Sequence, residues 1–194
     1  FVLTIKGNTD SIMYLGNYYA GGTYASDTAR RNSKGQFVFE KKNRPVFPGL
    51  YFFTSPSGRH VEFVVYNEMP NLTFVTDEKD WVGNMTVKGS KENEVFFSYQ
   101  KANDESYRKI QEAKSKMSEE EHKKFRHEIM VKNDDLKMSI IENHPDCFVT
   151  LLMNAPRTKE PPAVDEKGDS LTLTERAEYY GKHYFDNMAL DCNG

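Results

Sequence analysis

Short runs of alternating apolar and polar residues fill the first 89 positions of the chain. Gly, Pro and Asn separate these runs at intervals of about ten residues, a spacing typical of antiparallel sandwiches and barrels. The run at 60–66 (HVEFVVY) is apolar on both faces, which predicts a strand that is central or covered by helices. The sequence NSKG at 32–35 predicts a hairpin turn. The pattern as a whole predicts eight strands, over residues 1–6, 11–19, 23–29, 36–41, 50–54, 60–66, 72–76 and 85–88.

The apolar spacing changes to a helical period after Gly89. Ser90 is a favourable N-cap, and Ser118 with Glu121 has the sequence of a capping box in the middle of the stretch. A second helix start at this point predicts two helices in a hairpin over residues 90–143 rather than one long rod.

Each helix of this hairpin has only a thin apolar stripe, which polar Asn103 and Ser106 interrupt in the first helix. A hairpin with so little apolar surface obtains most of its helicity from tertiary packing, so we expect it to pack on the β-rich half. The prediction is that Phe96, Tyr99 and Ile110 are buried there, and that Phe96 is more deeply buried than Phe97 unless the helix is covered on two sides. The stripes consist of Phe96, Tyr99, Ile110, Ala113 and Met117, and then of Phe125, Ile129, Leu136 and Ile140.

Three further segments follow the hairpin: a short helix at 145–154, a linker rich in Pro and charge at 156–169, and a truncated helical end at 170–194. The predicted fold class is therefore α+β, with an antiparallel β-sandwich or open barrel over 1–89 and a helical region over 90–194. Composition divides at the same place. The charge balance is +2 before residue 90 and −5 after it, and 15 of the 25 aromatic residues precede Ser90.

Several classes of function fit the composition poorly. Lys and Arg form no stripe and the net charge is −3, which argues against a nucleic-acid partner. No apolar run approaches the roughly 20 residues of a membrane span. The chain starts at Phe1 inside a strand pattern, which indicates a trimmed or mature fragment. Cys147 and Cys192 do not form a C-x-x-C motif, and two states stay open: a disulfide between them, or a buried thiol at 147 and an exposed one at 192.

The sequence carries no recognisable catalytic, cofactor or metal motif. His122 and His127 lie five positions apart and so do not share the helical face of an i, i+4 zinc pair. Neighbouring acids such as Asp134 and Asp135 are typical of a solvated helix face. The chain is therefore expected not to be an enzyme and to hold no cofactor. A hydrolase stays open as a third option, because a cleft built from separate elements leaves no mark in sequence order.

Four tyrosines cluster around Gly21 and Gly22 and are the candidate ligand-binding residues: Tyr14, Tyr18, Tyr19 and Tyr24. Aromatic side chains on a β scaffold can line a groove for a glycan or a peptide, with ring stacking as the main contribution to affinity. The alternative is that these rings pack beneath the sheet. Solvent-exposed rings that line one groove would support the binding interpretation.

The order of several segments resembles the amino-terminal region of a family of Bacteroidetes cell-envelope proteins. They are DSIMYLGNYYAGGTYASDTA, GQFVFE, PGLYFF, EFVV, a V-x-G-S-x-x-N-x-x-F-x-x-Y pattern from Val87 to Tyr99, and ERAEYYGKHYFDNMAL. In that family a β-rich domain of unknown function and a helical region precede a thioredoxin-like thiol–disulfide oxidoreductase domain. This chain has no C-x-x-C motif, so the redox residues of the family have no counterpart here.

The resemblance implies a non-catalytic amino-terminal accessory or interaction module, exported to the cell envelope (periplasm or outer membrane). Its partner would be its own carboxy-terminal thioredoxin-like domain or another envelope protein. Contact with the membrane would come only through a lipid anchor that precedes this chain. The resemblance also implies O-glycosylation at Asp-Ser/Thr-apolar triplets, which places candidate sites at Ser11, Thr28 and Ser170. The alternative function is a glycan- or peptide-binding module built on the tyrosine cluster.

Overall fold

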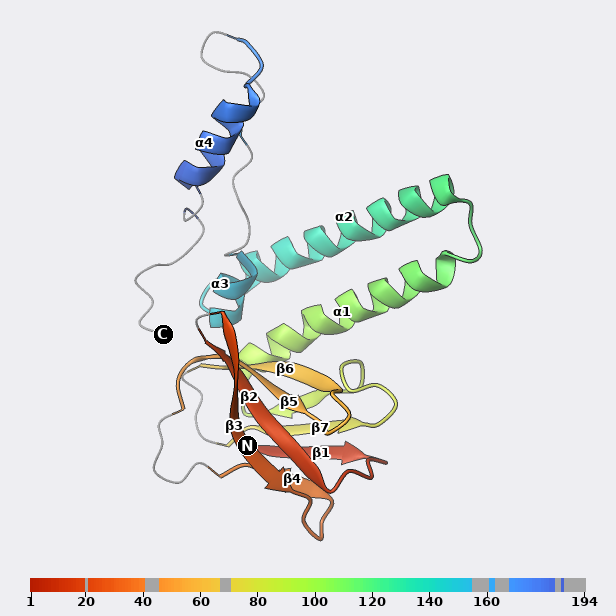
Figure 1. The fold of residues 1–194 in the computed structure, drawn as a ribbon, viewed down its shortest axis with the longest axis vertical. Helices are drawn as coiled ribbons and strands as arrows, with labels where there is room; N and C mark the ends of the chain where they lie inside the picture. The colour runs from red at the N-terminus through yellow and green to blue at the C-terminus, as the bar shows by residue number, and fades with distance from the viewer. Residues whose placement is uncertain are drawn as a thin grey trace.

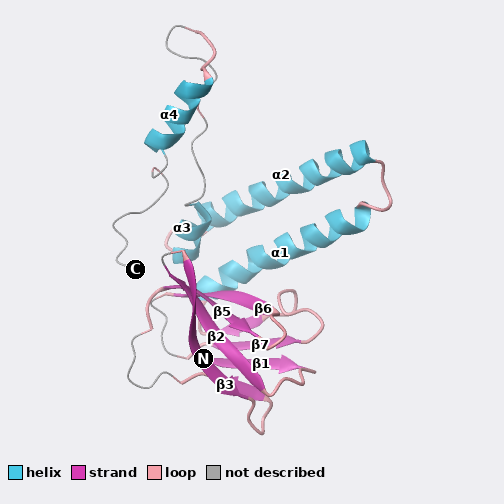
Figure 2. Cartoon of the chain, viewed as in Figure 1, coloured by secondary structure: helices cyan, strands magenta, loops and turns pink. Residues whose placement is uncertain are grey.

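The computed structural model describes residues 1–19, 21–40, 46–66, 71–154, 161–162, 168–183 and 186. Within these residues, two four-stranded sheets form a sandwich that is not closed into a barrel, and helices follow it (Figures 1 and 2). The first sheet has the order β4 (Gln36–Val38), β1 (Val2–Lys6), β7 (Thr73–Asp77), β8 (Thr86–Lys88). The second has the order β3 (Gly22–Arg30), β2 (Ile12–Tyr19), β5 (Gly49–Thr54), β6 (His60–Val65). Every predicted strand has a counterpart; the fourth ends three residues early, at Val38, and the ends of the others differ from the prediction by at most one residue.

Strand direction differs from the prediction in one place. β1 and β7 pair in parallel, from Val2 opposite Thr73 to Lys6 opposite Asp77, whereas all other neighbouring strands pair antiparallel. The chain leaves the first sheet after β1 and returns to it first as β4, which is antiparallel to β1. After two more strands of the second sheet it returns again as β7, which runs in the same direction as β1. Apolar alternation reports which face of a strand is buried but carries no information on direction.

The predicted turn at 32–35 forms, and an antiparallel bridge joins Arg31 to Phe37 across it, but β3 and β4 themselves do not pair as a hairpin. The Asn32 carbonyl accepts the Gly35 N–H, and the Asn32 side chain accepts the N–H groups of Lys34 and Gln36. β3 and β4 nevertheless belong to different sheets, so this turn carries the chain from one sheet to the other. The hairpin partner of β3 is β2, which pairs with it along its whole length.

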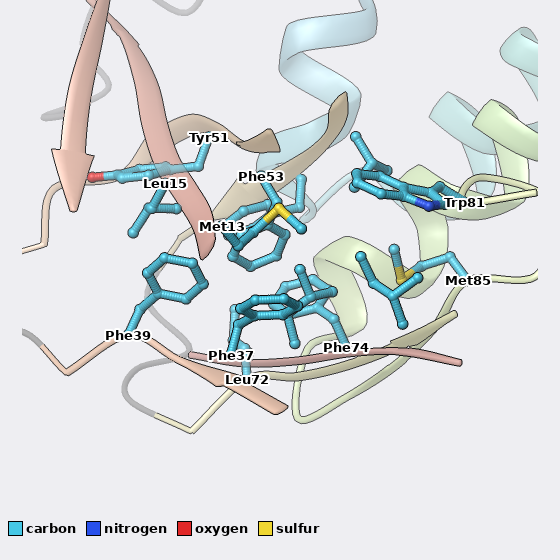
Figure 3. Packing of buried hydrophobic residues seen from close by; sticks show 14 of the residues in the cluster. Met13, Leu15, Phe37, Phe39, Tyr51, Phe53, Leu72, Phe74, Trp81 and Met85 are labelled. Carbon is cyan, nitrogen blue, oxygen red and sulfur yellow. The ribbon is translucent and has the colours of Figure 1, made fainter. Parts of the chain in front are cut away.

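The space between the sheets holds the main hydrophobic core (Figure 3). Phe53 and Phe63 from the second sheet stack with centroids 4.5 Å apart, and Phe74 from the first sheet lies within about 5 Å of both. Met13 and Leu15 face the same space from β2. Because these side chains come from both sheets, their burial requires the two sheets to be packed together.

The predicted helical hairpin is confirmed. It consists of α1 (Lys91–Ala113) and α2 (Glu119–Asn143) and projects from the sandwich as an arm (Figure 1). The Ser90 side chain accepts the Asn93 N–H as N-cap of α1, and Ser118 forms the capping box at the start of α2. Two short helices follow, α3 (Phe148–Asn154) and α4 (Leu173–His183), whereas most of the predicted linker at 156–169 lies outside the described residues.

β6 is an edge strand, yet both of its faces are covered. Val61, Phe63 and Val65 point into the main core, whereas Val64 is fully buried on the other face, in a second cluster that the helices form. The prediction that helices cover this strand is therefore right, although the strand is not central.

The predicted burial of Phe96 and Tyr99 against the sandwich is wrong, and the condition under which Phe97 would also be buried, a helix covered on two sides, is met. Phe97 is 3% exposed and belongs to the main core, whereas Phe96 and Tyr99 are half-buried and pack in the second cluster with α2 and α3. Ile110 is half-buried and lines a groove between α1 and α2 instead of meeting the sandwich. The reason is that α1 has neighbours on two sides at its root, so that positions facing the sandwich alternate with positions facing the other helices.

Candidate functional site

A fully buried amide, Asn93, joins the arm to the sandwich. Its Oδ1 accepts the Val64 N–H at 2.8 Å, and its Nδ2 donates to the Val64 carbonyl at 2.7 Å and to Ser90 Oγ at 2.8 Å. Since β6 is an edge strand, the Asn93 side chain occupies the position in which a further strand would pair with Val64. This contact leaves α1 little freedom to slide or rotate on the sheet.

The preceding residue, Glu92, joins the arm to α3. It is 5% exposed, and its two carboxylate oxygens accept the N–H groups of Phe148 and Val149 at 2.8 and 2.9 Å. Tyr66 at the end of β6 stacks on Phe148 at 4.7 Å with an interplanar angle of 7°. Glu92 therefore caps the first turn of α3, where backbone N–H groups have no partner within the helix.

Two further contacts tie α1 to the loop between β7 and β8. Lys101 Nζ donates to the Met85 carbonyl at 2.7 Å, and Arg108 pairs with Asp80 at 3.0 Å. The attachment of α1 to the sandwich half therefore extends from the root of the arm to Arg108.

The two polar residues that interrupt the stripe of α1 face α2. Ser106 Oγ donates to Asn133 Oδ1 at 2.9 Å, and Asn133 Nδ2 donates to Asn103 Oδ1 at 3.4 Å. A polar layer of this kind sets the register of two packed helices. On the far side of this layer, the described arm buries only Ala113 and Ile129.

A groove runs along the outer part of the arm; we call it the hairpin groove. It has a cavity of about 650 Å³ and is lined by Tyr107, Ile110, Gln111, Lys114, Met117, Glu119, His122, Arg126 and Met130. A smaller cavity of about 290 Å³ shares Tyr107, Ile110 and Met130 with it and extends to Val82 beside the sandwich. Tyr107 and Met130 are 61% and 58% exposed. Exposed apolar side chains that line a groove are typical of a surface that contacts another molecule.

The four predicted tyrosines are exposed, but they do not line one groove. Tyr14 and Tyr18 point away from the core on the outer face of the second sheet, because they alternate along β2 with buried Met13 and Leu15. Tyr19 is on the opposite side of β2, and its ring lies 6.5 Å from that of Tyr24. The cluster therefore divides into two pairs, and its role in ligand binding stays a prediction.

The outer pair has neighbours that the sequence analysis missed, Phe52 and Glu62. The Phe52 ring lies 5.1 Å from that of Tyr18 and covers Gly16, where any Cβ would collide with it. Tyr18 donates its hydroxyl to Glu62 Oε1 at 2.7 Å. Burial, together with this bond and the charge of Glu62, raises the pKa of Tyr18 to about 12. A glycine inside a strand pattern is a signal for close approach, but the pairing with Phe52 is not readable from the sequence.

The structure does not bring the candidate glycosylation sites and cysteines together into one site. Ser11, Thr28 and Ser170 are exposed, and their glycosylation stays a prediction. Cys147 is buried in the second cluster, whereas Cys192 lies outside the described residues. No three His, Cys, Asp or Glu side chains in the described part of the chain are close enough to hold a metal ion. None of the helices described is both long and apolar enough to cross a membrane.

Comparison with known proteins assigns part of the chain. Residues 3–96 match a family described as Domain of unknown function (DUF4369). The match spans the strands from β1 to β8 and the first turns of α1, so it includes Asn93 and Glu92. A search of curated proteins and a search of solved structures each found no match. The sandwich and the root of the arm therefore correspond to a domain whose function is not established.

Proposed function

We propose that this chain is a non-catalytic accessory and interaction module of a cell-envelope protein of the thiol–disulfide oxidoreductase type. The sandwich carries the arm, and the arm positions a partner. That partner is the thioredoxin-like domain of the same protein or another envelope protein, and the membrane is reached only through a lipid anchor that precedes this chain. The order of segments shared with Bacteroidetes envelope proteins supports this assignment.

The observation that carries the proposal is the contrast between the root and the outer part of the arm. The hydrogen bonds of Asn93 fix α1 to β6, and those of Glu92 fix it to α3. The whole of α1 is about 35 Å long, and toward its outer end the hairpin groove is lined by exposed apolar side chains. A helix pair that is fixed at its root and has an open groove at its outer end can hold a partner protein at a defined distance from the sandwich.

The buried polar groups also fit a structural role. The described residues include seven that are polar and buried, and each of them makes a hydrogen bond within the protein: Asn8, Ser55, Thr76, Ser90, Glu92, Asn93 and Thr150. Groups that are satisfied in this way stabilise the fold and are poorly suited to exchange protons with a substrate.

The first experiment tests catalysis. The purified chain is assayed for insulin reduction with dithiothreitol, with a thioredoxin as positive control. The expected rate equals that of dithiothreitol alone. Turnover above this background would show that the chain is itself a reductase and would refute the proposal.

The second experiment tests the groove in the full-length protein. Met130→Glu places a charge in the lining of the groove, whereas Val131→Glu makes the same change at the neighbouring exposed position, which does not line the groove. Cross-links between Lys114 and the following domain are expected to be lost in Met130→Glu and kept in Val131→Glu. Equal cross-linking in both variants would show that the hairpin groove does not contact the following domain.

A further inference from the structure

Strand register arranges the outer face of the second sheet into rows of neighbouring side chains. Tyr14 lies opposite Thr28 on one side and Thr54 on the other, and Thr54 lies opposite His60. In the next row Gly16 is opposite Phe52, which is opposite Glu62. Directly opposed residues point to the same face, so these side chains share one surface with Tyr18. We call Tyr14, Tyr18, Phe52 and Glu62 the aromatic face.

Helices cover one end of this surface and leave the rest open. Leu50 and Val64 pack in the second cluster beneath α1 and α3. Tyr14 and Tyr18 are 37% and 39% exposed. The open part is therefore an aromatic centre with a hydrophilic border, which includes exposed Thr28 and His60.

The chemistry of this surface is polar and rich in hydrogen-bonding groups, with one carboxylate at Glu62 and one cation, Arg30, in the neighbouring row opposite Ile12. The rows through Tyr14 and Gly16 hold threonines, an imidazole and a carboxylate, and neither row holds a Lys or an Arg. Glu62 uses Oε1 for Tyr18, so that Oε2 can accept a hydroxyl from a ligand. A surface of this kind does not attract phosphates or acidic peptides, but it suits a ligand with many hydroxyl groups.

The shape of the surface favours a ring-shaped ligand over an extended peptide. The Phe52 ring lies directly over the backbone at Gly16, and the Tyr18 ring meets it at 51°, which produces a shallow corner. A pyranose presents C–H groups on its flat faces, and these complement the electron-rich face of an aromatic ring. At the β6 edge of this sheet an extended peptide cannot pair with Val64, because Asn93 already occupies that position.

We propose that the aromatic face binds a neutral hexopyranose chain. Phe52 and Tyr14 stack against sugar rings, and Glu62, held in place by the Tyr18 hydroxyl, accepts a hydrogen bond from a sugar hydroxyl. This role is additional to that of an accessory module and does not depend on the groove, since the two surfaces share no residue.

The test is isothermal titration calorimetry of the whole chain with cellohexaose, maltohexaose, mannohexaose and chitohexaose, each raised to about ten times the expected Kd. A ligand held through one or two sugar rings is expected to bind with a Kd on the order of 1 mM. Tyr14→Ala and Glu62→Gln are each expected to weaken the binding roughly 3- to 10-fold. Tyr19→Ala is the matched control, because it removes an exposed tyrosine from the opposite face of the same strand, and it is expected to change the Kd less than about twofold.

Three outcomes would overturn the proposal. They are the absence of saturable binding to any of the four hexasaccharides, an equal loss of affinity in Tyr14→Ala and Tyr19→Ala, or saturable binding only to an extended hexapeptide used in parallel. Both substituted positions are at the surface, and an unchanged far-ultraviolet circular dichroism spectrum verifies that each variant is folded. The insulin assay does not involve this face, so either proposal can fail while the other stands.

Discussion

The sandwich and the outer part of the arm are stabilised in different ways. The side chains that are both large and fully buried belong to the sandwich, among them Trp81, Phe53, Phe63 and Phe74. Beyond the polar layer at Asn133, the described arm buries only Ala113 and Ile129. The sandwich therefore derives its stability from packing between elements distant in sequence. The outer arm depends mainly on local features, namely helix caps, i, i+4 ion pairs and one interhelical polar layer, together with the ion pair from Arg108 to Asp80.

The largest expected effect distinguishes the two neighbouring phenylalanines of α1. Phe97→Ala is expected to lower the free energy of unfolding by about 3–5 kcal/mol, because the ring lies in the main core and its loss leaves a cavity. Phe96→Ala is expected to cost roughly 1–2 kcal/mol, since part of that ring already contacts water. Urea titrations followed by the fluorescence of Trp81 measure both values. A larger cost at Phe96 would show that α1 is rotated relative to this structure.

A smaller effect is expected from two asparagine substitutions. Asn93 joins α1 to β6 at the root of the arm, and Asn133 joins α2 to α1 within the arm. Asn93→Ala is expected to cost about 2–4 kcal/mol, because the N–H and carbonyl of buried Val64 lose their partner. Asn133→Ala is expected to cost about 0.5 kcal/mol, since water reaches the groups that Asn133 contacts. The same urea titration applies. Equal costs would mean that the root is not the point at which the arm is fixed.

The smallest effect concerns the helix cap at the tip of the arm. Ser118→Ala removes one half of the capping box and is expected to cost about 1 kcal/mol locally. Amide hydrogen exchange should become faster at the start of α2, while the urea midpoint of the sandwich stays unchanged. A shift of that midpoint would contradict the independence of the outer arm.

The same cap predicts a dependence on pH. The hydrogen bonds from Ser118 hold the pKa of Glu121 below its ordinary value of 4.5. Because the pKa is depressed in the folded state, the cap stabilises α2 above pH 4.5, and this contribution is lost as the pH falls through the lowered pKa. The backbone amides at the start of α2 should therefore be less protected from exchange in acid than at neutral pH, after correction for the intrinsic pH dependence of exchange. In Ser118→Ala this difference in protection between the two pH values should disappear.

Local features of this protein were predictable from its sequence. The eight strands, the N-cap at Ser90 and the capping box at Ser118 depend on residues within a few positions of one another, so alternation and cap signals located them. The outer tyrosines were exposed, as the binding interpretation required, but the single groove that it also required did not form. Asn103 and Ser106 were visible only as interruptions of a stripe, although they form the polar layer with Asn133.

Tertiary structure alone decided the features that involve distant partners. Asn93 bonds to a strand 29 positions earlier, and Glu92 caps a helix 56 positions later. The parallel pairing of β1 with β7 and the deeper burial of Phe97 than of Phe96 have the same origin. Periodicity states which residues of an element share a face, but the neighbour of that face depends on how the whole chain packs.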